Sequence, residues 1–315
     1  MILITGGMGF IGLHTARRFL DAGKNVVLTQ YRARREPDFI KDEIGKRVTV
    51  ETLDVTSAHD VIDLVRRHKV TDIVHLAVPG LAALSAAEDY RVNMGGLINI
   101  LEAARLSDVR RVTLASSVAV YSGLPEGPFR EDQLLPVAAS NPTEAYKKAW
   151  ETLASHYASR TGLDVISARM SGIWGPLYHS MANLPSRLCH AAVRGVPAEF
   201  TGARGGVPYE DEEGDFCYVK DCAAGLALLQ MADTLPHRIF NIAAGVSRTN
   251  RELADAVKKV VPDAQITLQR GRGPRARPRP YLDITRATQD IGYKPEYDLE
   301  RGVADYIAWL RTNPT

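Results

Sequence analysis

Short apolar runs alternate with longer stretches of helical periodicity through the first half of the chain. The run Ile2–Ile4 leads through glycines to a helical stretch, Leu13–Ala22, and a second apolar run, Val26–Leu28, follows. Apolar runs of this length are typical of strands that are buried on both faces. We expect further strands at 48–53, 72–76, 111–116 and 163–168, and further helices at 59–68, 92–104 and 143–160. The alternation predicts an α/β fold, a doubly wound parallel sheet of six or seven strands with helices on both faces.

This regular alternation stops after Gly175-Pro176. The rest of the chain is rich in glycine and proline, and its expected helices are shorter, at 184–194, 221–231, 251–260 and 300–311. We therefore predict a larger domain at residues 1–170 and a smaller lobe at 171–315 that closes over it, either as a separate unit or interleaved with the first domain.

A glycine-rich turn joins the first expected strand to the first expected helix. Gly7, Gly9 and Gly12 satisfy G-x-G-x-x-G, and Gly6 extends the pattern to G-x-x-G-x-x-G. Such glycines let the backbone turn tightly and approach a pyrophosphate, whose charge is met by free N–H groups and the positive end of the helix dipole. In this strand–turn–helix context the motif predicts a Rossmann-type dinucleotide-binding domain.

Composition excludes several classes of protein. The chain has 315 residues, of which 45% are hydrophobic and 24% are charged, as in an ordinary soluble globular protein. A net charge of +2 argues against binding to nucleic acid through phosphate neutralisation. Charge is uneven, with an acidic run at 210–215 and an arginine-rich run at 270–279, and both are typical of solvated loops.

The chain shows no pattern of export, membrane insertion or metal binding. A strand that starts at residue 2 leaves no room for a signal peptide, and no apolar stretch reaches the ~18 residues of a membrane span. We therefore expect a cytoplasmic protein with no membrane partner. Cys189, Cys217 and Cys222 lack zinc-ligand spacing, so we expect reduced thiols and no metal.

The sequence resembles a known family along nearly its whole length. The matching segments follow the chain in order, at Asp54-Val55, His75-Leu76-Ala77, Val92-Asn93, Ser116-Ser117 with Tyr121, Arg169, Gly175-Pro176, Asp215-Phe216 and Phe240-Asn241. With the N-terminal glycines, they make the chain similar to the extended short-chain dehydrogenase/reductases, the NAD(P)-dependent nucleotide-sugar epimerases, dehydratases and reductases typified by UDP-glucose 4-epimerase. The resemblance implies hydride transfer between a sugar carbinol and the nicotinamide.

Motif and resemblance together give a set of expected site residues. The expected cofactor-binding residues are Gly6, Gly9, Phe10, Ile11, Gly12, Gln30, Arg32, Asp54, Val55, Leu76, Ala77, Asn93 and Lys147. The expected substrate-binding residues are Ser117, Arg169, Gly172, Arg275 and Arg277, with Arg279 as an alternative anion clamp. The resemblance also implies a homodimer formed through the helices near 95–104 and 143–158.

The end of the second expected strand bears on the choice of cofactor. An NAD enzyme usually offers an Asp or Glu there to the ribose 2′-hydroxyl, whereas this chain has Gln30. Gln30 cannot repel a 2′-phosphate and Arg32 could bind one, so we expect NAD or NADP with a slight preference for NADP. Alternatively, the arginines after Gln30 belong to a solvated loop.

The catalytic motif departs from the family pattern. The family's base is normally the tyrosine of Y-x-x-x-K, but Lys147 has Thr143 at the tyrosine position. The other register pairs Tyr146 with Trp150 and loses the lysine. A threonine hydroxyl is a poor base, since its pKa lies far above the ~10 of tyrosine. We therefore expect Thr143 to orient a substrate hydroxyl while Tyr146 or Tyr121 acts as acid and base, unless Tyr146 only packs the helix.

Ser117 completes the expected catalytic set of Ser117, Thr143, Tyr146 and Lys147. It precedes a tyrosine by four residues, as the hydroxyl-binding serine of the epimerases does, although a strand-end serine can also cap a loop. Val118 and Ala119 replace the Asp-Glu pair of the related 4,6-dehydratases, which disfavours dehydration. Gly172 stands where relatives commonly have an asparagine, so the substrate side has diverged.

Two functions agree with these residues. We favour an NAD(P)-dependent epimerase or ketoreductase that acts on a nucleotide-sugar or a similar hydroxylated substrate. The alternative is a dinucleotide-sensing or partner-binding relative, which has kept the fold and the cofactor but has lost sugar turnover together with the tyrosine.

Overall fold

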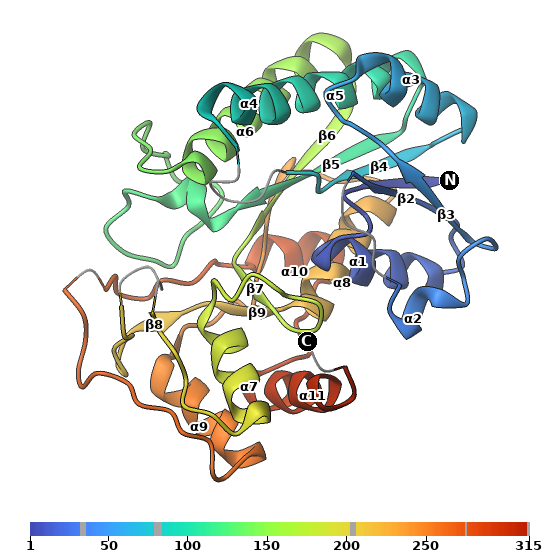
Figure 1. Cartoon of the computed structure of the whole chain (residues 1–315). Coiled ribbons are helices and arrows are strands. Elements are labelled where there is room, and N and C mark those ends of the chain that lie inside the picture. The colour runs from blue at the N-terminus through green and yellow to red at the C-terminus, as the bar shows by residue number, and fades with distance from the viewer. Residues whose placement is uncertain (32–35, 79–83, 202–205, 275, 314–315) are drawn as a thin grey trace.

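Seven parallel strands form the central sheet of the described chain. The computed structural model describes residues 1–31, 36–78, 84–201, 206–274 and 276–313 (Figure 1). The strands are β1 (Ile2–Thr5), β2 (Val26–Gln30), β3 (Val48–Thr52), β4 (Asp72–His75), β5 (Arg111–Ser117), β6 (Asp164–Met170) and β10 (Ile239–Ile242). They lie in the order β10-β6-β5-β4-β1-β2-β3. The strand order reverses direction at β1 and β4, which is where doubly wound sheets bind ligands at the carboxyl ends of their strands.

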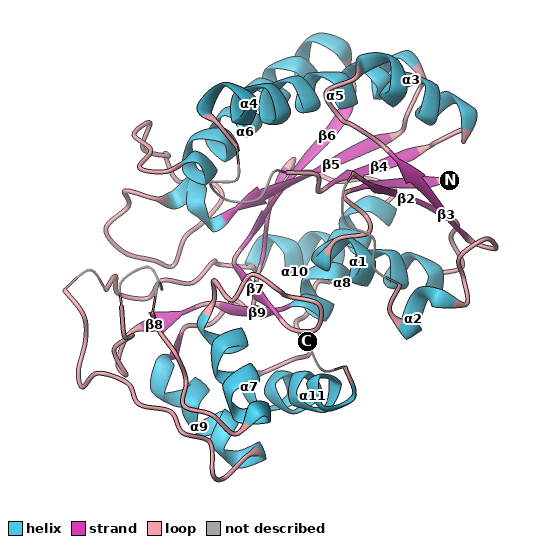
Figure 2. Ribbon diagram, in the orientation of Figure 1, coloured by secondary structure: helices cyan, strands magenta, loops and turns pink. Residues whose placement is uncertain are grey.

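Helices cover both faces of this sheet, as Figure 2 shows. One face carries α3 (Ala58–Arg67), α4 (Ala86–Tyr90), α5 (Gly96–Leu106) and α6 (Pro142–Thr161). The other face carries α1 (Phe10–Asp21), α2 (Asp38–Lys41), α8 (Val219–Met231) and α10 (Thr285–Ile291). Because both faces are covered, the strands read as continuous apolar runs. The predicted doubly wound α/β fold is confirmed.

A smaller lobe follows β6. It holds two two-stranded sheets, one of β7 (Gly172–Trp174) with β9 (Phe216–Tyr218) and one of β8 (Glu213–Gly214) with β11 (Arg248–Thr249). Its helices are α7 (Leu184–Arg194), α9 (Asn250–Val260) and α11 (Leu299–Thr312), which pack around a core that includes Trp174 and Tyr306. The segment after residue 170 also returns to the large sheet, since β10 pairs with β6 and α8 packs on α1.

Two short helical turns interrupt the regular pattern near the carboxyl ends of the strands. A π-helical turn, η1 (Arg91–Gly95), lies between α4 and α5, and a 3-10 turn, η2 (Val118–Tyr121), follows β5. Turns of the π type inside helices often mark functional sites. No described helix is long and apolar enough to cross a membrane.

The sequence fixes both ends of α6, the helix that carries Thr143 and Lys147. The side chain of Asn141 accepts a hydrogen bond from the backbone N–H of Glu144, and Pro142 occupies the first helical position. Gly162 ends the helix in the left-handed conformation, with φ of 75°. With both ends fixed, Thr143 and Lys147 lie one turn apart on one helix face.

Candidate functional site

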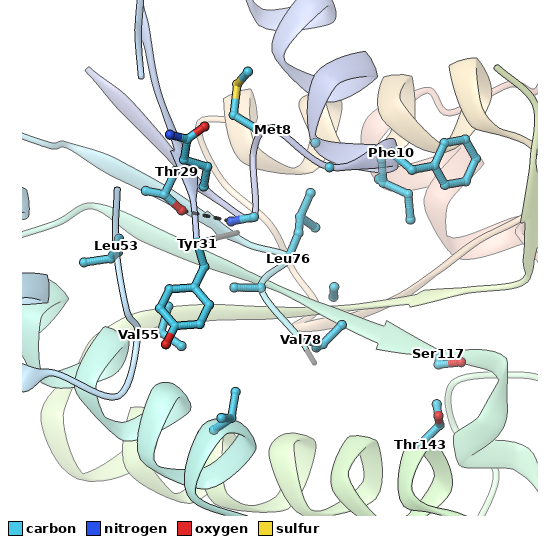
Figure 3. Close-up of a pocket in the computed structure, with 18 of the residues that line it drawn as sticks. Met8, Phe10, Thr29, Tyr31, Leu53, Val55, Leu76, Val78, Ser117 and Thr143 are labelled. Carbon is cyan, nitrogen blue, oxygen red and sulfur yellow. Dashed lines mark hydrogen bonds between the residues drawn. The ribbon is translucent and has the colours of Figure 1, made fainter. Parts of the chain in front are cut away.

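A cavity of about 940 Å³ lies along the carboxyl ends of β1, β2, β4 and β5. Its walls come from the glycine loop, from the segments after β2, β3 and β4, and from α6. Figure 3 shows Tyr31 and Val55 at one end and Ser117 and Thr143 at the other. The cavity therefore joins the predicted dinucleotide site to the predicted catalytic site.

The glycine loop packs too closely for side chains. Gly6 has φ of +65°, and a Cβ there would lie 3.1 Å from the Cα of Ala77. A Cβ on Gly12 would lie 2.6 Å from the Cα of Gly7. The hydroxyl of Thr29 on β2 accepts a hydrogen bond of 3.0 Å from the backbone N–H of Gly6, drawn as the dashed line in Figure 3. Backbone therefore forms the cavity wall here, as a bound pyrophosphate requires.

The N-terminus of α1 opens onto this wall. Phe10, Ile11 and Gly12 all line the cavity, and the N-cap residue, Gly9, offers no side-chain cap. The first N–H groups of a helix have no acceptor within it, and the first turn of α1 has no acidic residue. The loop and helix thus present donors and a positive dipole end to an anion.

Polar groups at the ends of β2 and β3 fit an adenosine. Gln30 and Asp54 both line the cavity, together with Val55. Asp54 accepts hydrogen bonds from the backbone N–H (2.9 Å) and the hydroxyl (2.7 Å) of Thr56. The Oε1 of Gln30 is buried and has no hydrogen-bond partner among the described residues. A buried acceptor without a partner is costly, and a ribose hydroxyl would satisfy it.

Other expected cofactor residues divide into three groups. Leu76 and Ala77 line the cavity after β4. Asn93 is buried in η1 and is not among the described lining residues; its amide donates to the backbone carbonyl (2.8 Å) and the carboxylate of Asp89. Arg32 lies outside the described residues.

Three expected catalytic side chains meet at the other end of the cavity. Ser117 ends β5, and its hydroxyl accepts a hydrogen bond of 3.1 Å from the backbone N–H of Ala119. Thr143 and Lys147 reach the same end from α6. Two hydroxyls and an amine thus line one end of a cavity that holds a dinucleotide motif at the other.

Lys147 is buried without a carboxylate partner in the described structure. Its Nζ donates a 2.5 Å hydrogen bond to the carbonyl of Ala115 and lies 3.9 Å from the centroid of the Trp150 ring. Burial lowers the pKa of Lys147 to about 7, and the negative charge of Glu151 partly opposes this shift. The amine therefore titrates close to neutral pH.

A buried polar network lies behind this end of the cavity. Arg169 forms an ion pair of 2.7 Å with Glu151, which also accepts from the hydroxyl of Ser116. Arg169 donates to the hydroxyl of Tyr121 (2.8 Å), which donates to Asn241 (2.9 Å). Burial raises the pKa of Tyr121 to about 12. Neither Arg169 nor Tyr121 is among the described lining residues.

The structure does not bring Tyr146 to the cavity. This side chain is half-buried on α6, and burial raises its pKa, with a further contribution from Asp89 on α4. Tyr146 is absent from the described lining residues. This position agrees with the packing alternative for Tyr146.

The described arginines of the run 270–279 do not line the cavity either. The guanidinium of Arg277 lies 5.3 Å from the Phe129 ring centroid, and Arg279 pairs with Glu126 at 3.1 Å. Gly172 begins β7 and is exposed. None of these three lines the cavity, and Arg275 lies outside the described residues.

Several lining residues carry no sequence signal of their own. These are Thr29, Tyr31, Glu88, Arg91, Met170, Ser171 and Ile173. Only position marks them, since they lie within or directly after a strand, or on α4 and η1. No group of three or more His, Cys, Asp or Glu side chains in the described part of the chain could hold a metal ion.

Comparison with known proteins gives matches along the whole chain. The model of the NAD dependent epimerase/dehydratase family matches residues 2–243. The UDP-glucose 4-epimerase of Mycolicibacterium smegmatis is 29% identical over 318 residues, with 98% of each chain covered. The crystal structure of Thermus thermophilus UDP-glucose 4-epimerase in complex with NAD has a TM-score of 0.79 and 25% identity, with 98% of each chain covered. The structure of MoeE5 with UDP-glucuronic acid and NAD has a TM-score of 0.82 and 26% identity, with 99% of each chain covered.

Proposed function

Because the chain belongs to the NAD dependent epimerase/dehydratase family, we propose that it is an epimerase or ketoreductase that acts on a nucleotide-sugar or similar hydroxylated substrate. The observation that carries the proposal is the single cavity that joins the glycine loop to Ser117, Thr143 and Lys147. Relatives named for UDP-glucose epimerisation, and neighbours solved with NAD and UDP-sugars, support the same substrate class.

The chain's own residues fit a nicotinamide dinucleotide. The loop Gly6–Gly9 and the N-terminus of α1 would hold the pyrophosphate, and Gln30 and Asp54 would hold the adenosine. A bound nicotinamide supplies the site with a hydride acceptor and donor. Ser117 and Thr143 would bind the substrate hydroxyl, and the apolar walls would exclude water from it.

The cofactor preference within this class is a finer proposal. Gln30 offers a neutral amide where a carboxylate would repel a 2′-phosphate, so NADP is at least as favourable as NAD. Binding constants for NAD and NADP, measured by calorimetry at one salt concentration, test this preference.

Assembly and location are further proposals. Ile98 on α5 is 45% exposed and Leu153 on α6 is 50% exposed, which supports a homodimer formed through these helices. A dimer of the 34.5 kDa chain has twice that mass by light scattering, and a monomeric mass contradicts it. Reduced, buried Cys189, Cys217 and Cys222 support a cytoplasmic location.

The test of function is turnover by the purified protein. The protein is incubated with NAD or NADP and with UDP-, GDP- and dTDP-sugars, and interconversion and nicotinamide absorbance are measured. Epimerised or reduced product is the expected result. A protein that binds the dinucleotide but converts none of these substrates would instead support the dinucleotide-sensing or partner-binding alternative.

A further inference from the structure

We call the end of the cavity lined by Ser117, Thr143 and Lys147 the catalytic end, and Lys147 is the one ionisable side chain that α6 contributes to the described lining. The described lining includes ionisable groups on Tyr31, Asp54, Glu88, Arg91 and Lys147. The first two follow β2 and β3 at the adenosine end, and Glu88 and Arg91 come from α4 and η1. Only Lys147 comes from the helix that carries Thr143.

The groups around Lys147 favour an amine that can lose its proton. Burial of an ammonium without an ion pair disfavours the charged form. Glu151 lies one turn further along α6, but its carboxylate is engaged by Arg169 of β6 and by the hydroxyl of Ser116. His75 of β4 carries no charge near neutral pH, because burial, and secondarily the charge of Lys147, lower its pKa to about 3.

The neutral amine keeps a free lone pair in this environment. One N–H of Lys147 is taken by the carbonyl of Ala115, and the Trp150 ring, with its centroid 3.9 Å from Nζ, is within reach of a weak N–H···π contact with the other. A primary amine has two N–H groups and one lone pair, so the lone pair remains for a proton donor.

Two hydroxyls of the site lie on the elements that hold the Lys147 amine, Thr143 on α6 and Ser117 on β5. Thr143 precedes Lys147 by four residues, so the two side chains lie on one helix face about 5–6 Å apart at Cβ. Ala115, whose carbonyl binds the amine, precedes Ser117 by two residues and therefore shares its face of β5. Figure 3 shows Ser117 and Thr143 at the same end of the cavity.

From these contacts we infer that the Lys147 amine is the proton acceptor and donor of the site, linked to a substrate hydroxyl through Thr143 with Ser117 beside it. The inference rests on the proposed function. It moves the acid/base role from the missing tyrosine to the lysine, which in Y-x-x-x-K enzymes only assists the phenol.

The step balances in both directions. In oxidation the substrate O–H proton passes to the Thr143 oxygen as the Thr143 proton passes to Nζ, which becomes an ammonium. A nicotinamide bound in the cavity would take up the hydrogen of the carbinol C–H bond with its electron pair, and the alcohol would become a ketone. Thr143 never carries a net charge, so its high pKa is no obstacle. Reduction of the ketone returns both hydrogens by the reverse path.

The proton state of Lys147 can be measured without turnover. The chain has 10 lysines, and lysine labelled with ¹³C at the ε carbon gives one signal for each in the full-length protein. We expect one signal to titrate near pH 7 and the others near their ordinary value of about 10.4. Lys147→Arg should remove the signal that titrates near pH 7. Lys148→Arg, a matched change on the same helix, should leave that signal in place. If every lysine signal titrates above about pH 9, the inference is overturned.

Kinetics separate this inference from the proposed function. Lys147→Arg keeps a cation but cannot lose its proton near neutrality, so kcat should fall about 100-fold or more and the limb of the pH profile near 7 should vanish. Thr143→Val should lower kcat while the lysine signal still titrates near 7, and Thr143→Ser should restore kcat. Persistent turnover in Lys147→Arg with an unchanged pH profile contradicts the inference alone. A wild-type protein that binds dinucleotide without turnover contradicts the proposed function, and the inference with it.

Discussion

The two ends of the cavity are built from different parts of the polypeptide. At the dinucleotide end the wall beside the expected pyrophosphate is backbone: a left-handed glycine, a glycine packed against another, and the first turn of α1. At the catalytic end the wall is side chains, which arrive from β5 and α6 and rest on a buried network that reaches β6 and β10.

The difference decides how each end responds to substitution. A backbone wall tolerates almost any side chain that points away from it, but it fails when a Cβ is added. A side-chain wall can change its chemistry by one residue, as with Thr143, while its supporting contacts persist. Binding at the dinucleotide end depends on the shape of the wall, and the chemistry of the catalytic end depends on charge and hydrogen bonds.

The largest expected effect is at the network behind the catalytic end. Glu151→Ala leaves the buried Arg169 without its carboxylate, which costs about 3–5 kcal/mol of the free energy of unfolding. Urea unfolding measures this loss. Lys259→Ala, which removes an exposed pair with Glu300, is the control and should change stability little. A loss in Glu151→Ala no larger than in the control would show that the network does not support this end.

The next effect is at the backbone wall. Gly12→Ala places a Cβ 2.6 Å from the Cα of Gly7, and overpacking of this kind costs about 1–3 kcal/mol. Dinucleotide affinity should fall about tenfold or more, because the loop must shift. Calorimetric titration measures the affinity. Gly95→Ala, where a Cβ meets no atom within 4 Å, is the matched control, and equal affinities in the two variants would refute the shape argument.

A third change introduces charge into the dinucleotide end. Gln30→Asp restores the carboxylate that binds a ribose 2′-hydroxyl and repels a 2′-phosphate. We expect NADP affinity to fall about tenfold, or about 1.4 kcal/mol, with NAD affinity kept or improved. Competition between the two dinucleotides measures the ratio. A fall in both affinities would mean that the shape of the Gln30 side chain, rather than its lack of charge, determines dinucleotide binding.

The smallest effect, taken over one pH unit, is the pH dependence of stability that Lys147 contributes. Its folded pKa of about 7 lies below the unfolded value, so above pH 7 the unfolded chain binds the extra proton and stability rises with pH. The slope contributed by this group is at most about 1.4 kcal/mol per pH unit. The difference in unfolding free energy between wild type and Lys147→Met, measured from pH 7 to 9, should therefore grow in favour of the wild type. A constant difference would place the amine's pKa outside this range.

The same contrast explains what the sequence could predict. The glycine spacing and apolar runs predict the sheet and the dinucleotide loop, because both depend on local backbone geometry. Strand β10 was not among the expected strands, since a four-residue run such as Ile239–Ile242 becomes a strand only by pairing with β6. The surroundings of Lys147 could not be predicted from the sequence either, because they come from β4, β5 and β6 as well as from its own helix.

Position in the fold also determines what individual residues can do. Tyr146 and Lys147 are neighbours in sequence, but successive helix residues point about 100° apart, so only one of them faces the cavity. Asn93 follows a helical pattern, but the π turn directs its amide to Asp89 and leaves its carbonyl for the indole N–H of Trp150 at 3.1 Å. Neither outcome follows from residue type alone.

Trp150 gives the protein an intrinsic optical reporter. The indole is fully buried, stacked on the His75 ring at 4.9 Å, with the Lys147 amine 3.9 Å from its own ring centroid. A proton gained or lost by that amine changes the electric field across the chromophore, so tryptophan fluorescence should change as the amine titrates. A protein with Trp174 and Trp309 replaced by phenylalanine would isolate this emission, and stopped-flow mixing could then follow the proton in time without any added label.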